Sequence, residues 1–224
     1  MSLEKHFNSV KNRINKAILL QQNNSFVDLL AVSKKQPLNK IKTLYALGQR
    51  KFGESYVQES ILKIIELNDL SIQWHFIGPI QSNKTKAIAQ HFSWVHSVDS
   101  LKVMTRLNKQ RPSNLPKLNV LLQLKVGDET SKRGFSKQEL LDLCTQQADF
   151  EHVNIRGLMS IPAPKVSYNE QLEQFKLCYD AFMKMKKIIN IDTLSIGMSG
   201  DLEAAIESGA TMVRIGSDIF GPRV

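Results

Sequence analysis

Short apolar runs alternate with amphipathic stretches along most of the chain. Eight runs rich in Val, Ile, Leu and aromatic residues have the length of buried β-strands, and they cover residues 26–33, 51–53, 73–77, 94–98, 117–125, 153–158, 193–196 and 212–215. In the segments between them apolar positions recur at helical spacing, and these segments cover residues 38–47, 56–67, 84–91, 101–108, 137–148, 169–188 and 202–208. One more helix is predicted at residues 3–20, before the first strand.

The order of these elements predicts the fold class. Strands that alternate strictly with helices pair in parallel through right-handed crossovers. Eight such strands are what a closed (β/α)₈ barrel requires, so we expect an α/β TIM barrel with an additional N-terminal helix. A doubly wound open sheet is the alternative. Because the chain has no Pro- or Ser-rich linker, residues 1–224 are expected to form a single domain.

Composition narrows the class of protein. The chain is 42% hydrophobic and 23% charged, which is typical of soluble globular domains. No apolar run is long enough to span a bilayer, and the N-terminus mixes charges where a signal peptide needs an apolar stretch. We therefore expect a cytoplasmic protein without membrane contact. Cys144 and Cys178 lack metal-ligand spacing, so reduced thiols are expected and no metal site is predicted.

The net charge of +9 raises the question of a nucleic-acid partner. The lysines are scattered, and the chain has no aromatic RNA-binding motif. The densest cluster, residues 184–187, is interpreted as a solvated helix face. Nucleic acid is therefore not favoured, and a diffuse positive field would instead attract phosphorylated metabolites.

Two turns near the C-terminus carry candidate chemistry. Each follows a predicted strand, at residues 197–201 and 216–217, and each is rich in Gly and Ser. Where such a turn leads into a helix, backbone N–H groups and the helix dipole stabilise an anion, and TIM barrels often hold phosphate after strands seven and eight. The alternative is that the glycines permit tight turns and the serine caps a helix. The phosphate-binding candidates are Ser199, Gly200, Gly216 and Ser217.

Two lysines, Lys34 and Lys35, follow the first predicted strand. A lysine held among apolar walls near another cation has a lowered pKa and attacks carbonyl groups. Together with a phosphate site, it suggests pyridoxal 5′-phosphate (PLP), whose aldehyde forms a Schiff base with lysine. Strand alternation places Lys34 on the face of Leu30 and Val32, so Lys34 is the candidate. The alternative is a solvated turn pair.

The chain resembles the YggS/PROSC family of PLP-binding homeostasis proteins over essentially its whole length. The matching stretches occur in order and include Ala-Val-Ser-Lys at 31–34, Phe-Gly-Glu-Ser-Tyr-Val-Gln-Glu at 52–59, Trp-His-Phe-Ile-Gly-Pro at 74–79, Gly-Met-Ser-Gly-Asp at 197–201 and Arg-Ile-Gly-Ser at 214–217. The resemblance implies a PLP lysine at Lys34, a phosphate-binding serine at Ser199 and an Arg-x-Gly-Ser segment at Arg214, Gly216 and Ser217. It also implies a fold similar to the barrel domain of alanine racemase without the second domain.

Other residues of these motifs have two interpretations each. Asn83 is a candidate donor to the pocket or a helix cap, and Met198 is a candidate cofactor contact or simple barrel packing. His75 is expected to be a packed, hydrogen-bonded strand histidine. Ser55 stands where the family usually has asparagine, which affects a pocket-lining amide. The turn at residues 131–134 resembles a family motif and meets either ligand or solvent.

Arg214 bears on what the cofactor would do. PLP withdraws electrons best when its ring nitrogen is protonated, whereas a guanidinium donates only to an unprotonated nitrogen. Racemases also supply acid and base from both faces of the cofactor, one of them from a separate domain. Because 224 residues barely fill one barrel, no second domain is expected to supply that group here. We therefore expect a PLP carrier without catalytic residues, and a monomer. The resemblance implies that this carrier acts in vitamin B6 homeostasis and serves PLP-dependent client enzymes. The alternatives are a small PLP-dependent amino-acid racemase and a basic adaptor for nucleic acid or protein.

Overall fold

The β-strands of the computed structural model, which describes residues 2–21, 26–126 and 133–221, close into a barrel. Each strand pairs in parallel with the next, and the last pairs with the first. This confirms the TIM barrel and excludes the open sheet. The strands are β1 (Asp28–Val32), β2 (Lys51–Glu54), β3 (Gln73–Phe76), β4 (Trp94–Val98), β5 (Leu118–Gln123), β6 (Val153–Met159), β7 (Thr193–Ser195) and β8 (Met212–Ile215).

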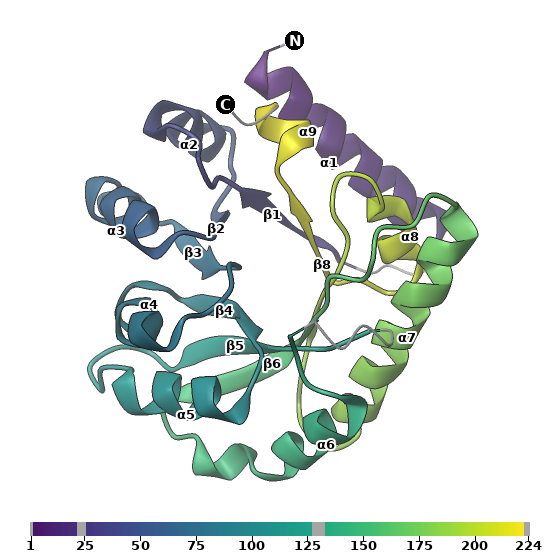
Figure 1. The fold of residues 1–224 in the computed structure, drawn as a ribbon. Coiled ribbons are helices and arrows are strands. Elements are labelled where there is room, and N and C mark those ends of the chain that lie inside the picture. The colour runs from purple at the N-terminus through teal and green to yellow at the C-terminus, as the bar shows by residue number, and fades with distance from the viewer. Residues whose placement is uncertain (1, 22–25, 127–132, 222–224) are drawn as a thin grey trace.

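Helices surround the barrel (Figure 1). They are α1 (Leu3–Leu20), α2 (Leu38–Ala46), α3 (Val57–Glu66), α4 (Thr85–His91), α5 (Leu101–Gln110), α6 (Lys137–Thr145), α7 (Tyr168–Lys186), α8 (Leu202–Glu207) and α9 (Ser217–Phe220), with 3₁₀ turns η1 (Ser82–Lys84) and η2 (Gln147–Asp149). The extra N-terminal helix is thus confirmed. The sequence did not predict α9, because four residues are too few to show a helical period.

The N-terminal helix α1 packs against the C-terminal part of the barrel. Its buried residues are Phe7, Val10, Ile14 and Ala17, spaced by three or four positions as on one helix face. That face contacts α8 and α9, which follow the last two strands, and Figure 1 shows α1 running beside both. The packing brings a segment from the start of the chain against the two turns that the sequence singles out.

Two further expectations concern cysteines and membranes. Cys144 and Cys178 are buried and form no disulfide, as expected, and burial raises the pKa of each thiol to about 11, so both are unreactive. In the described part of the chain, no helix is long and apolar enough to cross a membrane. Within the same residues, no three His, Cys, Asp or Glu side chains are grouped as metal ligands.

Candidate functional site

A cavity of about 310 Å³ lies at the carboxyl ends of the strands. Such a volume is at the lower end of the range for small-molecule pockets. All of the sequence-predicted site residues except Asn83 line it. The complete lining is Val32, Lys34, Ile77, Met159, Ile161, Met198, Ser199, Gly200, Arg214, Gly216 and Ser217.

Asn83 is not among the residues that line this cavity, so its part as a pocket donor stays a prediction. It belongs to the exposed 3₁₀ turn η1, where the chain leaves the barrel mouth for α4. Ile77 lines the cavity from the same loop. The side chains of residues 81–83 do not cap a helix either, because neither η1 nor α4 has a side-chain cap.

Two other motif residues also lie away from the cavity lining. Ser55 is half-buried and its carbonyl oxygen packs against Gly78, where a Cβ atom would approach it to 2.3 Å. In the turn at 131–134, residues 131 and 132 lie outside the described residues, and the Arg133 Nη1 atom lies 3.9 Å from an Asp99 carboxylate oxygen. Neither residue is part of the lining set.

The two lysines after β1 diverge in a tight turn. The Gln36 N–H donates to the Ser33 carbonyl oxygen at 3.0 Å, which places Lys34 and Lys35 at the centre of the turn. Lys35 has φ 59°, a left-handed conformation that costs a non-glycine residue about 1 kcal/mol. Its ammonium lies 5.9 Å from the centre of the Tyr56 ring, in the exposed part of the turn. Lys34 lines the cavity, so the two side chains separate as strand alternation predicts.

A charged cluster of the buried Glu54 and Lys63 and the half-buried Glu59 bonds to this turn. The Lys63 ammonium donates to the Ser33 carbonyl at 2.8 Å and pairs with Glu54 Oε1 at 2.9 Å and Glu59 Oε1 at 2.6 Å. Glu59 Oε1 also accepts the backbone N–H of Lys35 at 2.6 Å. The cluster therefore bonds to the backbone on both sides of Lys34, at the Ser33 carbonyl and at the Lys35 N–H.

Glu54 is the most deeply buried member of this cluster. Burial raises the pKa of its carboxyl above the ordinary value, although Lys63 and the Ser33 hydroxyl oppose the rise. Its Oε1 atom accepts the Ser33 O–H at 2.6 Å, while Oε2 is buried and has no partner among the described residues. Lys63 therefore opposes the effect of burial on the Glu54 carboxyl and lowers its pKa.

The loop after β7 is a compact turn. Asp201 Oδ1 accepts the Met198 N–H at 2.6 Å, and the Asp201 N–H donates to the Met198 carbonyl at 3.2 Å. Gly197 has φ +89°, and a Cβ atom there would lie 2.5 Å from the Cβ of Ala205, so this position requires glycine. At Gly200 a Cβ atom would meet no atom within 4 Å, so its glycine leaves space open instead of relieving a clash.

The candidate serines meet across the loops after β7 and β8. The Ser217 hydroxyl donates to the Ser199 hydroxyl at 3.1 Å. Ser199 does not cap α8, because the N-cap residue is Asp201 and no side chain bonds there. Since α8 and α9 are only six and four residues long, the hydroxyls and loop N–H groups, not helix dipoles, are the candidate anion-binding groups.

Arg214 is held rigidly inside the barrel. Its Nη1 atom donates to the Ser195 carbonyl at 2.6 Å and to the Ser195 hydroxyl at 2.9 Å, and Nη2 donates to the Ser160 carbonyl at 3.0 Å. Burial lowers the pKa of the guanidinium to about 10, so it stays charged at neutral pH. The cavity therefore contains a fixed hydrogen-bond donor that does not give up its proton.

A chain of hydrogen bonds runs from Arg214 through the barrel interior. Ser195 Oγ lies 3.2 Å from His96 Nδ1, His96 Nε2 lies 2.9 Å from His75 Nδ1, and His75 Nε2 lies 3.0 Å from Gln73 Oε1. A guanidinium only donates, so the Ser195 hydroxyl is free to donate to His96. With Gln73 Oε1 as the acceptor at the far end, we expect each imidazole to accept at Nδ1 and to donate through Nε2.

Both imidazoles in this series of hydrogen bonds, those of His75 and His96, are neutral. Burial, followed by the neighbouring charges, holds the pKa of His75 and His96 well below the ordinary range. His75 also stacks on Trp94 with ring centroids 5.2 Å apart. It is a packed and hydrogen-bonded strand residue, as expected, and its partner His96 was not singled out in the sequence.

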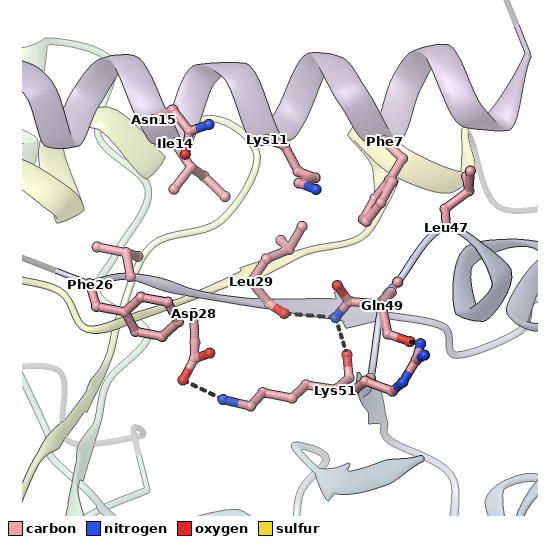
Figure 2. A pocket seen from close by; sticks show the side chains of 13 residues that line it. Phe7, Lys11, Ile14, Asn15, Phe26, Asp28, Leu29, Leu47, Gln49 and Lys51 are labelled. Atoms are coloured by element: carbon pink, nitrogen blue, oxygen red, sulfur yellow. Dashed lines mark hydrogen bonds and ion pairs between the residues drawn. The ribbon is translucent and has the colours of Figure 1, made fainter. Parts of the chain in front are cut away.

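A second cavity of about 370 Å³ lies at the amino ends of β1 and β2, under α1 (Figure 2). Figure 2 shows that several of its polar groups bond to one another, among them Lys51 and Asp28. The Lys51 ammonium lies 2.5 Å from the Asp28 carboxylate. Gln49 Nε2 donates to the carbonyls of Leu29 and Lys51 at 2.8 and 2.6 Å. These groups serve the fold, so the smaller cavity at the carboxyl ends is the better candidate for a ligand site.

Comparison with known proteins gives the family. Residues 15–224 match the alanine racemase N-terminal domain family. The pyridoxal phosphate homeostasis protein of Escherichia coli K12 is 49% identical over 201 residues, which cover 88% of this chain and 86% of the relative. The protein of that name from Haemophilus influenzae is 43% identical over 229 residues, covering 100% of this chain and 97% of the relative.

Solved structures agree with the sequence comparison. PipY of Synechococcus elongatus PCC7942, solved with PLP bound, matches with a TM-score of 0.85 and 32% identity over 98% of this chain and 100% of PipY. Alanine racemase from Corynebacterium glutamicum matches with a TM-score of 0.66 at 18% identity, over 94% of this chain and 61% of the racemase, which shows a shared fold. The chain therefore belongs to the family of pyridoxal phosphate homeostasis proteins, which is built on the barrel of the alanine racemase N-terminal domain.

Proposed function

We propose that this protein binds PLP in the cavity at the carboxyl ends of the strands and serves in PLP homeostasis, with Lys34 forming a Schiff base with the aldehyde. The observation that carries the proposal is that Lys34, the Ser199–Ser217 pair and Arg214 all line one cavity. PLP bound to the 32% identical PipY supports the same ligand.

The donor set fits the cofactor group by group. The Lys34 amine suits an aldehyde. The hydroxyls of Ser199 and Ser217 suit a phosphate, and the open space at Gly200, where a side chain would otherwise project, leaves room for it. Arg214 presents a fixed N–H donor suited to an unprotonated ring nitrogen.

The same residues favour a carrier over an enzyme. Bound PLP would supply a reactive aldehyde and an electron-withdrawing ring. Arg214 keeps its proton at neutral pH, so it would donate to the ring nitrogen and leave that nitrogen unprotonated. Among the described residues that line the cavity, there is no His, Cys, Tyr, Asp or Glu to move a second proton. An amino-acid racemase remains the second candidate, supported by the shared fold with alanine racemase.

Titration of the apoprotein with PLP tests the proposal. We expect a visible absorption band that borohydride removes. Lys34→Ala should abolish the band, and Lys35→Ala, its matched control, should retain it. The absence of a band in the wild type, or its survival in Lys34→Ala, would overturn the assignment.

The carrier assignment needs a separate test. The loaded protein is incubated with L-alanine in deuterated buffer, and deuterium at Cα and the D-isomer are measured. We expect exchange close to that of free PLP at equal concentration. Vigorous racemisation would promote the enzyme alternative. Client enzymes, the monomeric state and the cytoplasmic location stay predictions from the sequence.

A further inference from the structure

Arg13 of α1 contacts both loops that carry the candidate serines. Its guanidinium makes a two-pronged contact with Glu203, from Nε at 2.7 Å and from Nη2 at 2.9 Å. Nη1 pairs with Asp218 at 2.6 Å, and Nη2 also donates to the Ser199 carbonyl at 3.1 Å. One side chain from the start of the chain therefore ties the loop after β7 to the loop after β8.

These contacts matter for the charge near the site. Glu203 and Asp218 lie in the first turns of α8 and α9, close in sequence to Ser199 and Ser217. Unpaired carboxylates there would repel a phosphate. The Arg13 side chain is 34% exposed and pairs with both carboxylates, so its positive charge offsets their negative charges. Arg13 itself does not line the cavity.

The contact with the Ser199 carbonyl also sets the direction of a backbone donor. A trans peptide is planar, so its C=O and the following N–H point in opposite directions, and the described residues contain no cis peptide bond. With the Ser199 carbonyl turned to Arg13, the Gly200 N–H faces away from Arg13. Gly200 and Ser199 both line the cavity.

We propose that Arg13 is a positioning residue for phosphate recognition: it fixes the loops after β7 and β8 so that the Ser199 and Ser217 hydroxyls and the Gly200 N–H converge on a phosphate monoester. This inference rests on the proposed function, because the phosphate is that of PLP. It gives α1, which the barrel repeat does not require, a direct part in the site (Figure 1).

Ligands with and without phosphate separate positioning from simple structural support. The dissociation constants of the apoprotein for PLP and for pyridoxal are measured in wild type, Arg13→Gln and Arg13→Lys, with Arg50→Gln as the control. Arg50 lies on the Tyr45 ring and bonds to the Tyr45 carbonyl, outside the site. Thermal unfolding of each variant is recorded in parallel.

We expect Arg13→Gln to weaken PLP binding about tenfold or more, since it removes hydrogen bonds between charged groups. Pyridoxal binding should change less than about twofold, because pyridoxal lacks the phosphate that these loops recognise. Arg13→Lys keeps the charge but not the fork, so it should restore part of the affinity. An equal loss for both ligands, or no loss for PLP, would overturn the proposal. Failure of the wild type to bind either ligand would instead overturn the proposed function.

Glu203→Gln decides the question if Arg13→Gln does not fold. If Arg13 acted through its charge alone, this variant should bind PLP more tightly, because a carboxylate near the phosphate is removed. If Arg13 positions the loops, the variant should bind PLP more weakly, because Arg13 loses its two-pronged partner. Tighter PLP binding by Glu203→Gln would therefore contradict the positioning role.

Discussion

At the scale of single residues, the cluster behind Lys34 explains how a strained backbone persists. Lys35 adopts a left-handed conformation, and the surrounding contacts from Glu59 and Lys63 hold the turn in place. Strain of this kind is maintained where the neighbouring structure over-determines the backbone, often at binding sites. The candidate amine therefore stands on a turn whose shape depends on one buried lysine.

Lys63→Met should lower the free energy of unfolding by about 3 kcal/mol at pH 7, because it leaves the Glu54 carboxylate buried without its cation. The pKa of Glu54 is already raised by burial, and losing Lys63 raises it further. The folded state then binds the proton more tightly than the unfolded state, so the loss of stability relative to wild type shrinks as pH falls towards 5. Urea unfolding at pH 7 and 5 measures this. Equal losses at both values, or no recovery in Lys63→Met with Glu54→Gln, would contradict it.

The buried histidines predict a pH dependence of the opposite sign. The pKa values of His75 and His96 are held well below the ordinary range, so the unfolded state takes up protons that the folded state does not. Stability should be constant above pH 6.5 and fall below it by up to about 1.4 kcal/mol per pH unit for each histidine. His75→Gln should reduce the slope. Nitrogen NMR should show both rings as neutral Nε2–H tautomers, and an Nδ1–H tautomer in either ring would contradict the direction of the chain.

At the scale of elements, the sequence predicts the strands and helices that depend on local patterns of residues. Every predicted strand and long helix is present, because periods of two and of 3.6 residues are visible within a few residues. The ion pair of Lys63 with Glu59 could also have been predicted, since the two residues are four positions apart on one helix. The contacts of Arg13 could not, because its partners lie 186 to 205 residues away in sequence and no local pattern marks them. The place of Asn83 relative to the cavity could not be predicted, because nothing in the sequence signals the direction of the 3₁₀ turn η1.

The loop after β7 offers a matched pair of glycines. Gly197→Ala should destabilise the protein by about 1–3 kcal/mol, since it combines positive φ with a contact of 2.5 Å to Ala205. Gly200→Ala meets no atom within 4 Å, so its stability should stay within about 0.5 kcal/mol of wild type. Its PLP affinity should nevertheless fall several-fold, about 1 kcal/mol, because the methyl group takes space that the phosphate needs. Thermal unfolding and PLP titration of both variants test this, and unchanged PLP binding by Gly200→Ala would place the phosphate elsewhere.

At the scale of the whole molecule, one barrel carries the complete proposed site. The chain spans 86% and 97% of the two homeostasis proteins described above but only 61% of alanine racemase. The barrel supplies an amine, hydroxyls and a fixed guanidinium. Among the described lining residues it supplies no further acid–base group, and for this reason we propose that the site holds PLP and does not transform an amino acid on it.

The most direct test of this account is to locate the covalent bond to PLP. The loaded wild-type protein is reduced with borohydride and digested, and the modified peptide is sequenced by mass spectrometry. We predict one pyridoxyl group, on Lys34, which lines the cavity, and none on Lys35. A pyridoxyl group on Lys35 or on another lysine, with Lys34 unmodified, would contradict the account.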